Sequence, residues 1–166
     1  MRKTRLNGAG IALLVALASS ACSGGSRGTA GLELAGHDLG VTEVGASFDT
    51  ALSKITDVLG TPSTDPAPGH SCPGSTREVA WPGLRIGERD GLLIGWVSTS
   101  GELATDKGIR VGSTQASLMR SYGDNLALVP ATAGVGTSFA VDGTSLAGNI
   151  GPSGEVSALF SGACGV

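Results

Sequence analysis

Residues 40–60 read GVTEVGASFDTALSKITDVLG, and this stretch predicts an amphipathic helix over 48–59. Apolar side chains recur at the three- and four-residue spacing of one helical face, at Phe48, Leu52, Ile55 and Leu59. Ser47 suits the N-cap, and Gly60 suits the left-handed position that ends a helix. The stretch therefore predicts one continuous helix whose first and last residues are marked by capping residues.

A shorter copy of this stretch occurs further along the chain. Residues 108–123 read GIRVGSTQASLMRSYG, with Ser113 at the expected N-cap and Gly123 at the expected end. Leu118 and Tyr122 carry the apolar face of this second predicted helix. We interpret the two stretches as a tandem repeat with a period near sixty residues, the alternative being two unrelated short helices.

Predicted strands follow each helix. Alternating apolar residues and turn signals predict strands at 78–81, 84–86 and 92–97, and again at 138–141, 145–150 and 156–160. The glycines that end helices or form turns repeat at offsets of 63, 60 and 63 residues. We therefore expect an α+β fold of two tandem helix-plus-antiparallel-β-meander repeats, 32–101 and 102–166, with the helices packed on one face of the sheets.

The N-terminal residues 1–21 have the pattern of an export signal. Basic side chains lie at Arg2, Lys3 and Arg5, followed by an apolar run too short to cross a bilayer. Small residues precede Cys22, which resembles a bacterial lipobox with Ser19 in place of the usual large aliphatic residue. We expect lipidation at Cys22 and a flexible tether over 22–31. The alternative is ordinary cleavage near Ala21.

The charge balance excludes some partners. All 14 acidic residues follow Cys22 while three of the 11 basic ones precede it, which leaves eight basic residues against 14 and a net charge of −6. Such a chain has no basic patch for nucleic acid. Attachment to a membrane would come from the lipid alone, on the extracytoplasmic face of a bacterial cell membrane.

The expected bonding state of the cysteines follows from this location. With Cys22 lipidated, Cys72 and Cys164 remain, and an oxidising compartment favours a disulfide between them. If Cys22 is unmodified, three thiols compete for this bond. A rival use is a metal or small-ligand site formed by His37, His70 and Cys72, although one close His–Cys pair is a weak metal signal.

Candidate contact residues come from the sheets. A meander with a helix on one face leaves its other face open, and aromatic side chains there would bind a protein partner. The candidates are Trp81, Trp96, Phe139 and Phe160, for each of which a place in the core is the alternative. Asp90, at the tip of the predicted turn 87–91, is a further candidate, and a solvated turn is the alternative there.

The sequence does not favour catalysis. Its two histidines lie in no nucleophile or zinc-protease motif, and its paired carboxylates Glu88 and Asp90 lie in an exposed turn. No glycine-rich phosphate loop follows a strand and opens a helix. We therefore expect a protein that is not an enzyme and binds no cofactor.

The lipobox-like signal and the element Gly-Ile-Arg-Val-Gly-Ser…Tyr-Gly, followed by strands, resemble the SmpA/OmlA (BamE-like) lipoprotein family. The tandem arrangement is similar to the β-lactamase inhibitory protein superfamily. The resemblance implies a non-catalytic cell-envelope lipoprotein that binds another envelope or secreted protein through an open sheet face. It also leaves open an inhibitor of a secreted enzyme, for which Asp90 would be the inserted residue.

Overall fold

The computed structural model describes residues 31–63, 71–130 and 136–165. The first half contains α1 (Phe48–Leu59), β1 (Arg77–Trp81), β2 (Leu84–Arg89) and β3 (Leu92–Ser98). The second half contains α2 (Gln115–Tyr122), a short 3₁₀ helix (Gly123–Asn125), β4 (Leu126–Pro130), β5 (Thr137–Val141), β6 (Ala147–Ile150) and β7 (Val156–Gly162).

Both predicted helices are present, and their starts differ in detail from the expectation. Helix α1 spans the predicted residues and ends at Gly60, whose φ of 81° only glycine adopts freely. Ser47 occupies its N-cap position without a side-chain hydrogen bond. In α2 the cap is Thr114 and not Ser113, because the Thr114 hydroxyl oxygen accepts the Ser117 N–H at 3.2 Å.

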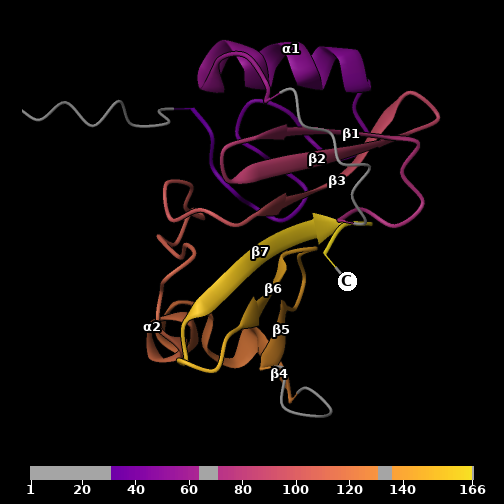
Figure 1. Ribbon diagram of the computed structural model, residues 1–166. Helices are drawn as coiled ribbons and strands as arrows, with labels where there is room; N and C mark the ends of the chain where they lie inside the picture. The colour runs from indigo at the N-terminus through magenta and orange to yellow at the C-terminus, as the bar shows by residue number, and fades with distance from the viewer. Residues whose placement is uncertain (1–30, 64–70, 131–135, 166) are drawn as a thin grey trace, which may run out of the picture.

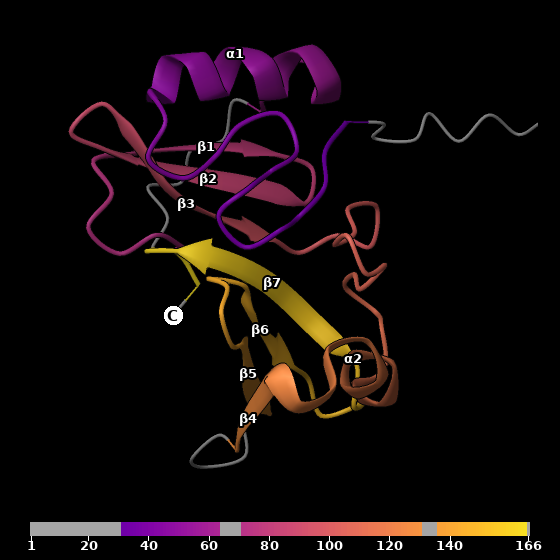
Figure 2. The same cartoon turned by 180° about the vertical axis from the view of Figure 1, so that it is seen from behind.

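The predicted architecture of two tandem helix-plus-meander repeats is wrong. The strands form a single antiparallel sheet of seven strands in the order β1-β2-β3-β7-β6-β5-β4 (Figure 1). The last strand of each half, β3 and β7, pair with each other and so fuse the two meanders. The second half also contributes a fourth strand, β4, at the edge of the sheet (Figure 2), where the described residues of the first half have only a bridge from Ser63 to Ala80.

The junction between β3 and β7 depends on close backbone approach. Gly95 lies opposite Gly162, and a Cβ on Gly95 would overlap the Ser161 carbonyl oxygen. Just beyond the ladder, the Ala163 N–H donates to the Ile94 carbonyl at 2.9 Å. Any larger residue at position 95 would push the two strands apart, so glycine here fixes the continuity of the sheet.

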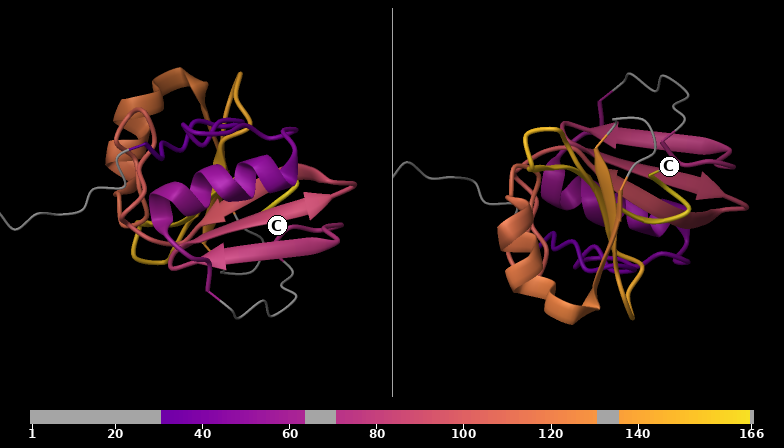
Figure 3. Two further views of the ribbon diagram at one scale, coloured as in Figure 1. Left: turned by 90° about the horizontal axis from the view of Figure 1, so that it is seen from above. Right: turned by 90° about the horizontal axis from the view of Figure 1, so that it is seen from below.

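The register of the strands defines two faces. Trp81 lies opposite Leu84 and Val79 opposite Ile86, which puts these four side chains on one face. This helix face continues through Trp96 and Leu159 to Phe139 on the far strands. Buried side chains of α1 and α2 belong to the same core cluster, so both helices cover this face (Figures 1 and 3).

The disulfide between Cys72 and Cys164 is present, as predicted, and it lies on the opposite face of the sheet. A Cβ on Gly87 would come within 2.6 Å of Cys72, so the loop before β1 presses directly on β2. Glu78 holds that loop, because its carboxylate accepts the Cys72 N–H at 3.0 Å and the Ser75 hydroxyl at 3.1 Å. The C-terminal residues are tied to the same loop by a bond from the Gly165 N–H to the Ser71 carbonyl at 2.7 Å.

In the described ranges, no helix has the length and apolar character needed to cross a bilayer.

From the surroundings of Tyr122, the chain's one tyrosine, we predict that the folded protein loses stability at alkaline pH. Burial raises the pKa of its phenol, the charge of Asp106 adds to this, and a hydrogen bond to Thr105 at 3.1 Å opposes it. The pKa of the Tyr122 phenol is therefore higher in the folded state than its unfolded value of about 10. The stability that comes from keeping this phenol neutral is fully present below pH ~10, and it is lost as the pH rises through the folded pKa.

Phenolate absorbance measures this transition without interference from other tyrosines. We expect its midpoint above 10.0 in the native protein and close to 10.0 in urea. Tyr122→Phe should lose the associated part of the alkaline destabilisation. A native midpoint at or below the urea value would contradict the burial of this phenol.

Candidate functional site

The structure does not present three of the candidate contact residues to a partner. Trp81, Trp96 and Phe139 lie on the helix face and are at most 3% exposed. Each indole also has a backbone acceptor, since the Trp81 Nε1–H donates to the Gly60 carbonyl at 2.8 Å and that of Trp96 to the Gly36 carbonyl at 3.1 Å. These residues stabilise the core, which corrects their assignment to an open face.

We call the face of the sheet that lies away from the helices the open face. Among the described residues of strands β4–β7, Phe160 is the one aromatic residue whose side chain lies on this face. It is half-buried, and the backbone at Gly165 lies against its ring. The other side chains of the open face on these strands are small or short: Ala127, Val129, Ser138, Ala140, Ala147, Asn149 and Ala158. Apart from the half-buried Phe160, the open face of β4–β7 therefore lacks the large anchors that dominate binding energy in protein interfaces.

Asp90 forms the tip of the β2–β3 hairpin, in a two-residue Asp-Gly turn of the kind that requires a positive φ at both residues. Its φ of 56° is positive, and among the described residues no other side-chain-bearing residue has a positive φ. The neighbouring Gly91 N–H donates to the Glu88 carboxylate at 2.7 Å, and the Phe48 N–H donates to the Gly91 carbonyl at 2.9 Å. The hairpin tip is thus held at both sides while the Asp90 side chain is exposed.

A groove of about 380 Å³ lies beside this hairpin. We call it the hairpin groove, and its lining is His37, Val44, Gly45, Arg89, Asp90, Leu92, Leu93, Ile94 and Ala163. Leu92 is 46% exposed, whereas Leu93 beside it is fully buried. His37, Arg89 and Asp90 are exposed around it, so an apolar floor is bordered by ionisable side chains.

Three distant parts of the chain build the hairpin groove, and backbone hydrogen bonds hold them together. The Gly45 N–H donates to the Leu93 carbonyl at 2.7 Å, and the Leu93 N–H donates to the Ala46 carbonyl at 2.9 Å. The bond from Ala163 to Ile94 closes the third side. Because Ala163 follows β7, the groove has its full lining only when β3 and β7 are paired.

The remaining site predictions concern residues that the structure describes in part. No group of three or more histidine, cysteine, aspartate or glutamate side chains that could hold a metal ion occurs among the described residues. His70 and the predicted lipidation site Cys22 lie outside them. Cys72, the third member of the metal hypothesis, is bonded to Cys164 and so is not a free thiolate ligand.

The fold defines a seven-stranded antiparallel sheet with both helices on one face. No protein-family model matches the chain, and no curated protein does. Among solved structures, the crystal structure of the uncharacterized protein yfeY from Escherichia coli matches with 13% sequence identity and a TM-score of 0.45, covering 79% of this chain and 97% of that one.

Proposed function

We propose that this protein is an exported, lipid-anchored cell-envelope protein that binds another envelope or secreted protein through the hairpin groove. The observation that carries the proposal is a groove of about 380 Å³ in which the exposed Leu92 lies beside the charged side chains of Arg89 and Asp90. Apolar centres with polar borders are the usual anatomy of protein interfaces. We place the protein on the extracytoplasmic side, where the disulfide between two buried cysteines would persist.

The chemistry of the groove favours a protein partner with an apolar side chain flanked by polar groups. The rim carries both charge signs, so a partner can pair with Arg89 and Asp90 at once. Neither side chain forms an ion pair with a described residue, so both are available. The small side chains on the open face of β4–β7 offer no comparable anchor.

A photo-crosslinking amino acid at position 92 tests this proposal in the full chain. We expect a discrete adduct with one envelope or secreted protein, and no such adduct from position 140 on the open face. Asp90→Ala should weaken the adduct from position 92. An adduct from position 140 alone, or from neither position, would exclude the hairpin groove as the contact surface.

The exposed side chain of Asp90 at the tip of the β2–β3 hairpin suits a second candidate, an inhibitor of the β-lactamase inhibitory type that inserts this residue into an active-site cleft. Purified protein would then inhibit a class A β-lactamase, and Asp90→Asn would relieve the inhibition without lowering Tm. Absence of inhibition at high protein concentration removes this candidate and leaves the first in place.

The anchoring part of the proposal rests on Cys22, and metabolic labelling with palmitate tests it directly. We expect label in the chain as produced and none in Cys22→Ser. Label that persists in Cys22→Ser, or is absent from both, would show that the cysteine is not the lipid attachment point.

A further inference from the structure

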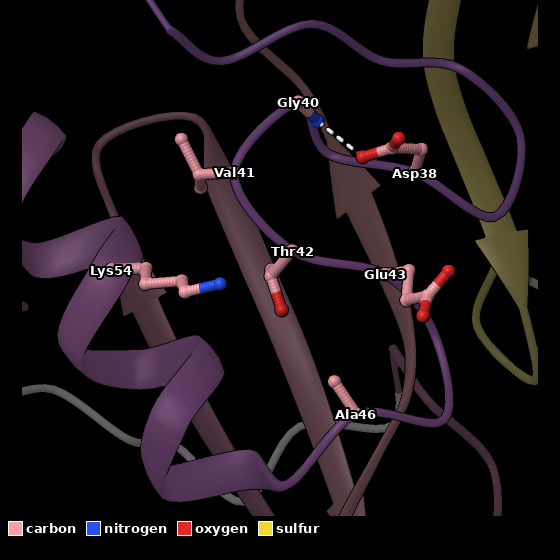
Figure 4. A pocket seen from close by; sticks show the side chains of 7 residues that line it. All are labelled: Asp38, Gly40, Val41, Thr42, Glu43, Ala46 and Lys54. Carbon is pink, nitrogen blue, oxygen red and sulfur yellow. Dashed lines mark hydrogen bonds between the residues drawn. The ribbon is translucent and has the colours of Figure 1, made fainter.

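Three segments line the hairpin groove, and two of them are braced by hydrogen bonds that involve no cysteine. The first is the tip of the β2–β3 hairpin, where the Gly91 N–H donates to the Glu88 carboxylate at 2.7 Å. The second is the loop 37–46, and Figure 4 shows the bond inside it from the Gly40 N–H to Asp38, at 2.6 Å. These two walls of the groove therefore do not depend directly on the disulfide.

The third segment, residues 163–165, does depend on it, and we call this segment the strap. Ala163 lines the groove, and Cys164 forms the disulfide with Cys72. The Gly165 N–H donates to the Ser71 carbonyl at 2.7 Å. The strap is thus the wall of the groove that is fastened, through the disulfide, to the loop before β1.

Non-covalent contacts of the strap with other described segments are few. Its backbone donates to the Ile94 carbonyl at 2.9 Å and to the Ser71 carbonyl at 2.7 Å, and Gly165 lies against the Phe160 ring. Ordering the backbone of a residue costs about as much free energy as one or two hydrogen bonds return. Two bonds and one ring contact therefore do not offset the ordering of three residues, and the disulfide supplies the difference.

The other half of the disulfide belongs to a loop that is anchored independently. The Cys72 N–H donates to the Glu78 carboxylate at 3.0 Å, and the Arg85 guanidinium donates to the Ser71 hydroxyl at 3.1 Å. Glu78 lies on β1 and Arg85 on β2, so the sheet itself holds this loop. Closing the disulfide fixes the strap to a segment that is already in place.

The bond is protected once it has formed. Cys72 is 1% exposed and Cys164 is 4% exposed, so a thiol in solution reaches neither sulfur while the strap is closed. Its formation needs an oxidant, here a compound that itself contains a disulfide. One cysteine thiolate attacks that disulfide and the second cysteine then displaces it, so two electrons and two protons pass to the oxidant, which leaves as two thiols.

We propose that oxidation of Cys72 and Cys164 completes the hairpin groove and so confines partner binding to protein that has reached an oxidising compartment. With both thiols reduced, the hairpin tip and the loop 37–46 keep their places while the strap separates from Ile94. The link to partner binding rests on the proposed function, whereas the link between the disulfide and the third wall stands on the contacts of the strap alone.

Amide hydrogen exchange in the full chain tests this link by comparing Ala163 with Leu93, whose N–H is bonded within the same groove. In the oxidised parent both amides should open with the same free energy. The double variant replaces Cys72 and Cys164 with alanine. There the Ala163 amide should exchange at least about a hundredfold faster than the Leu93 amide, after correction for intrinsic rates, because frayed segments open with a free energy near zero. The matched control Cys22→Ser keeps this disulfide and should behave as the parent.

Equal exchange at the two amides of the double variant overturns the proposal. If both stay slow, hydrogen bonds alone hold the strap. If both become fast, in buffer and also in sucrose, which favours the folded state, the disulfide holds the whole fold and not one wall of the groove.

A photo-crosslinking amino acid at position 92 separates this inference from the proposed function. We expect the adduct of the parent to be lost in the double variant, and an adduct of equal strength in both would contradict the coupling. Absence of an adduct from the parent would instead refute the proposed contact surface, and with it the confinement of binding, while the exchange result still decides whether the disulfide closes the groove.

Discussion

Replacing both Cys72 and Cys164 with alanine should lower the free energy of unfolding by about 4–5 kcal/mol, the value that the chain-entropy description gives for a loop of this size. The bond joins residues 92 positions apart, so its loss frees most of the folded chain in the unfolded state. It also releases the C-terminal residues from the loop before β1. A loss of this size is a large fraction of the stability of an ordinary domain.

Urea unfolding with and without reductant measures this effect. The parent protein should be destabilised by dithiothreitol, whereas the double alanine variant should give the same transition in both conditions. If the variant unfolds at the urea concentration of the oxidised parent, the disulfide does not constrain the fold in the way described.

Trp96→Ala should lower the free energy of unfolding by about 3–5 kcal/mol, the usual loss for truncating a buried tryptophan. Its side chain is fully buried on the helix face and donates to the Gly36 carbonyl from the loop at the start of the first half. The truncation therefore leaves both a cavity and an unpaired carbonyl.

Leu92→Ala is the matched control, because Leu92 lies on the same strand and is 46% exposed. Its effect on stability should stay within about 0.5 kcal/mol, while its effect on partner binding should be large. The reverse pattern, a stable Trp96→Ala variant that no longer binds, would return Trp96 to the role of a surface contact.

Local patterns predicted the local elements well. The spacing of Phe48, Leu52, Ile55 and Leu59 gave the bounds of α1, because caps and periodicity act within one element. The disulfide also followed from the sequence, since two cysteines remained once Cys22 was set aside. The side-chain faces of the first hairpin were left open, although the two-residue turn Pro82–Gly83 was a signal that places Trp81 opposite Leu84.

The non-local features were not predictable from the same patterns. The pairing of β3 with β7 joins residues more than sixty positions apart, and no local periodicity reports it. Strand β4, with the sequence Leu-Ala-Leu-Val-Pro, is a short apolar run without polar alternation, and periodicity alone does not distinguish such a run from a buried helix segment. The hairpin groove was missed for the same reason, since its lining comes from segments that meet only in the fold.

Hydrogen exchange across the junction of β3 and β7 tests the central claim, one continuous sheet that assembles the hairpin groove. The account predicts that the Ala163 amide, bonded to Ile94, and the backbone amides of the facing pair Trp96 and Ser161 exchange only through global unfolding, with the same free energy in both halves. Fast exchange at these amides while α1 and β5 stay protected would show two separately folded halves and would contradict the account.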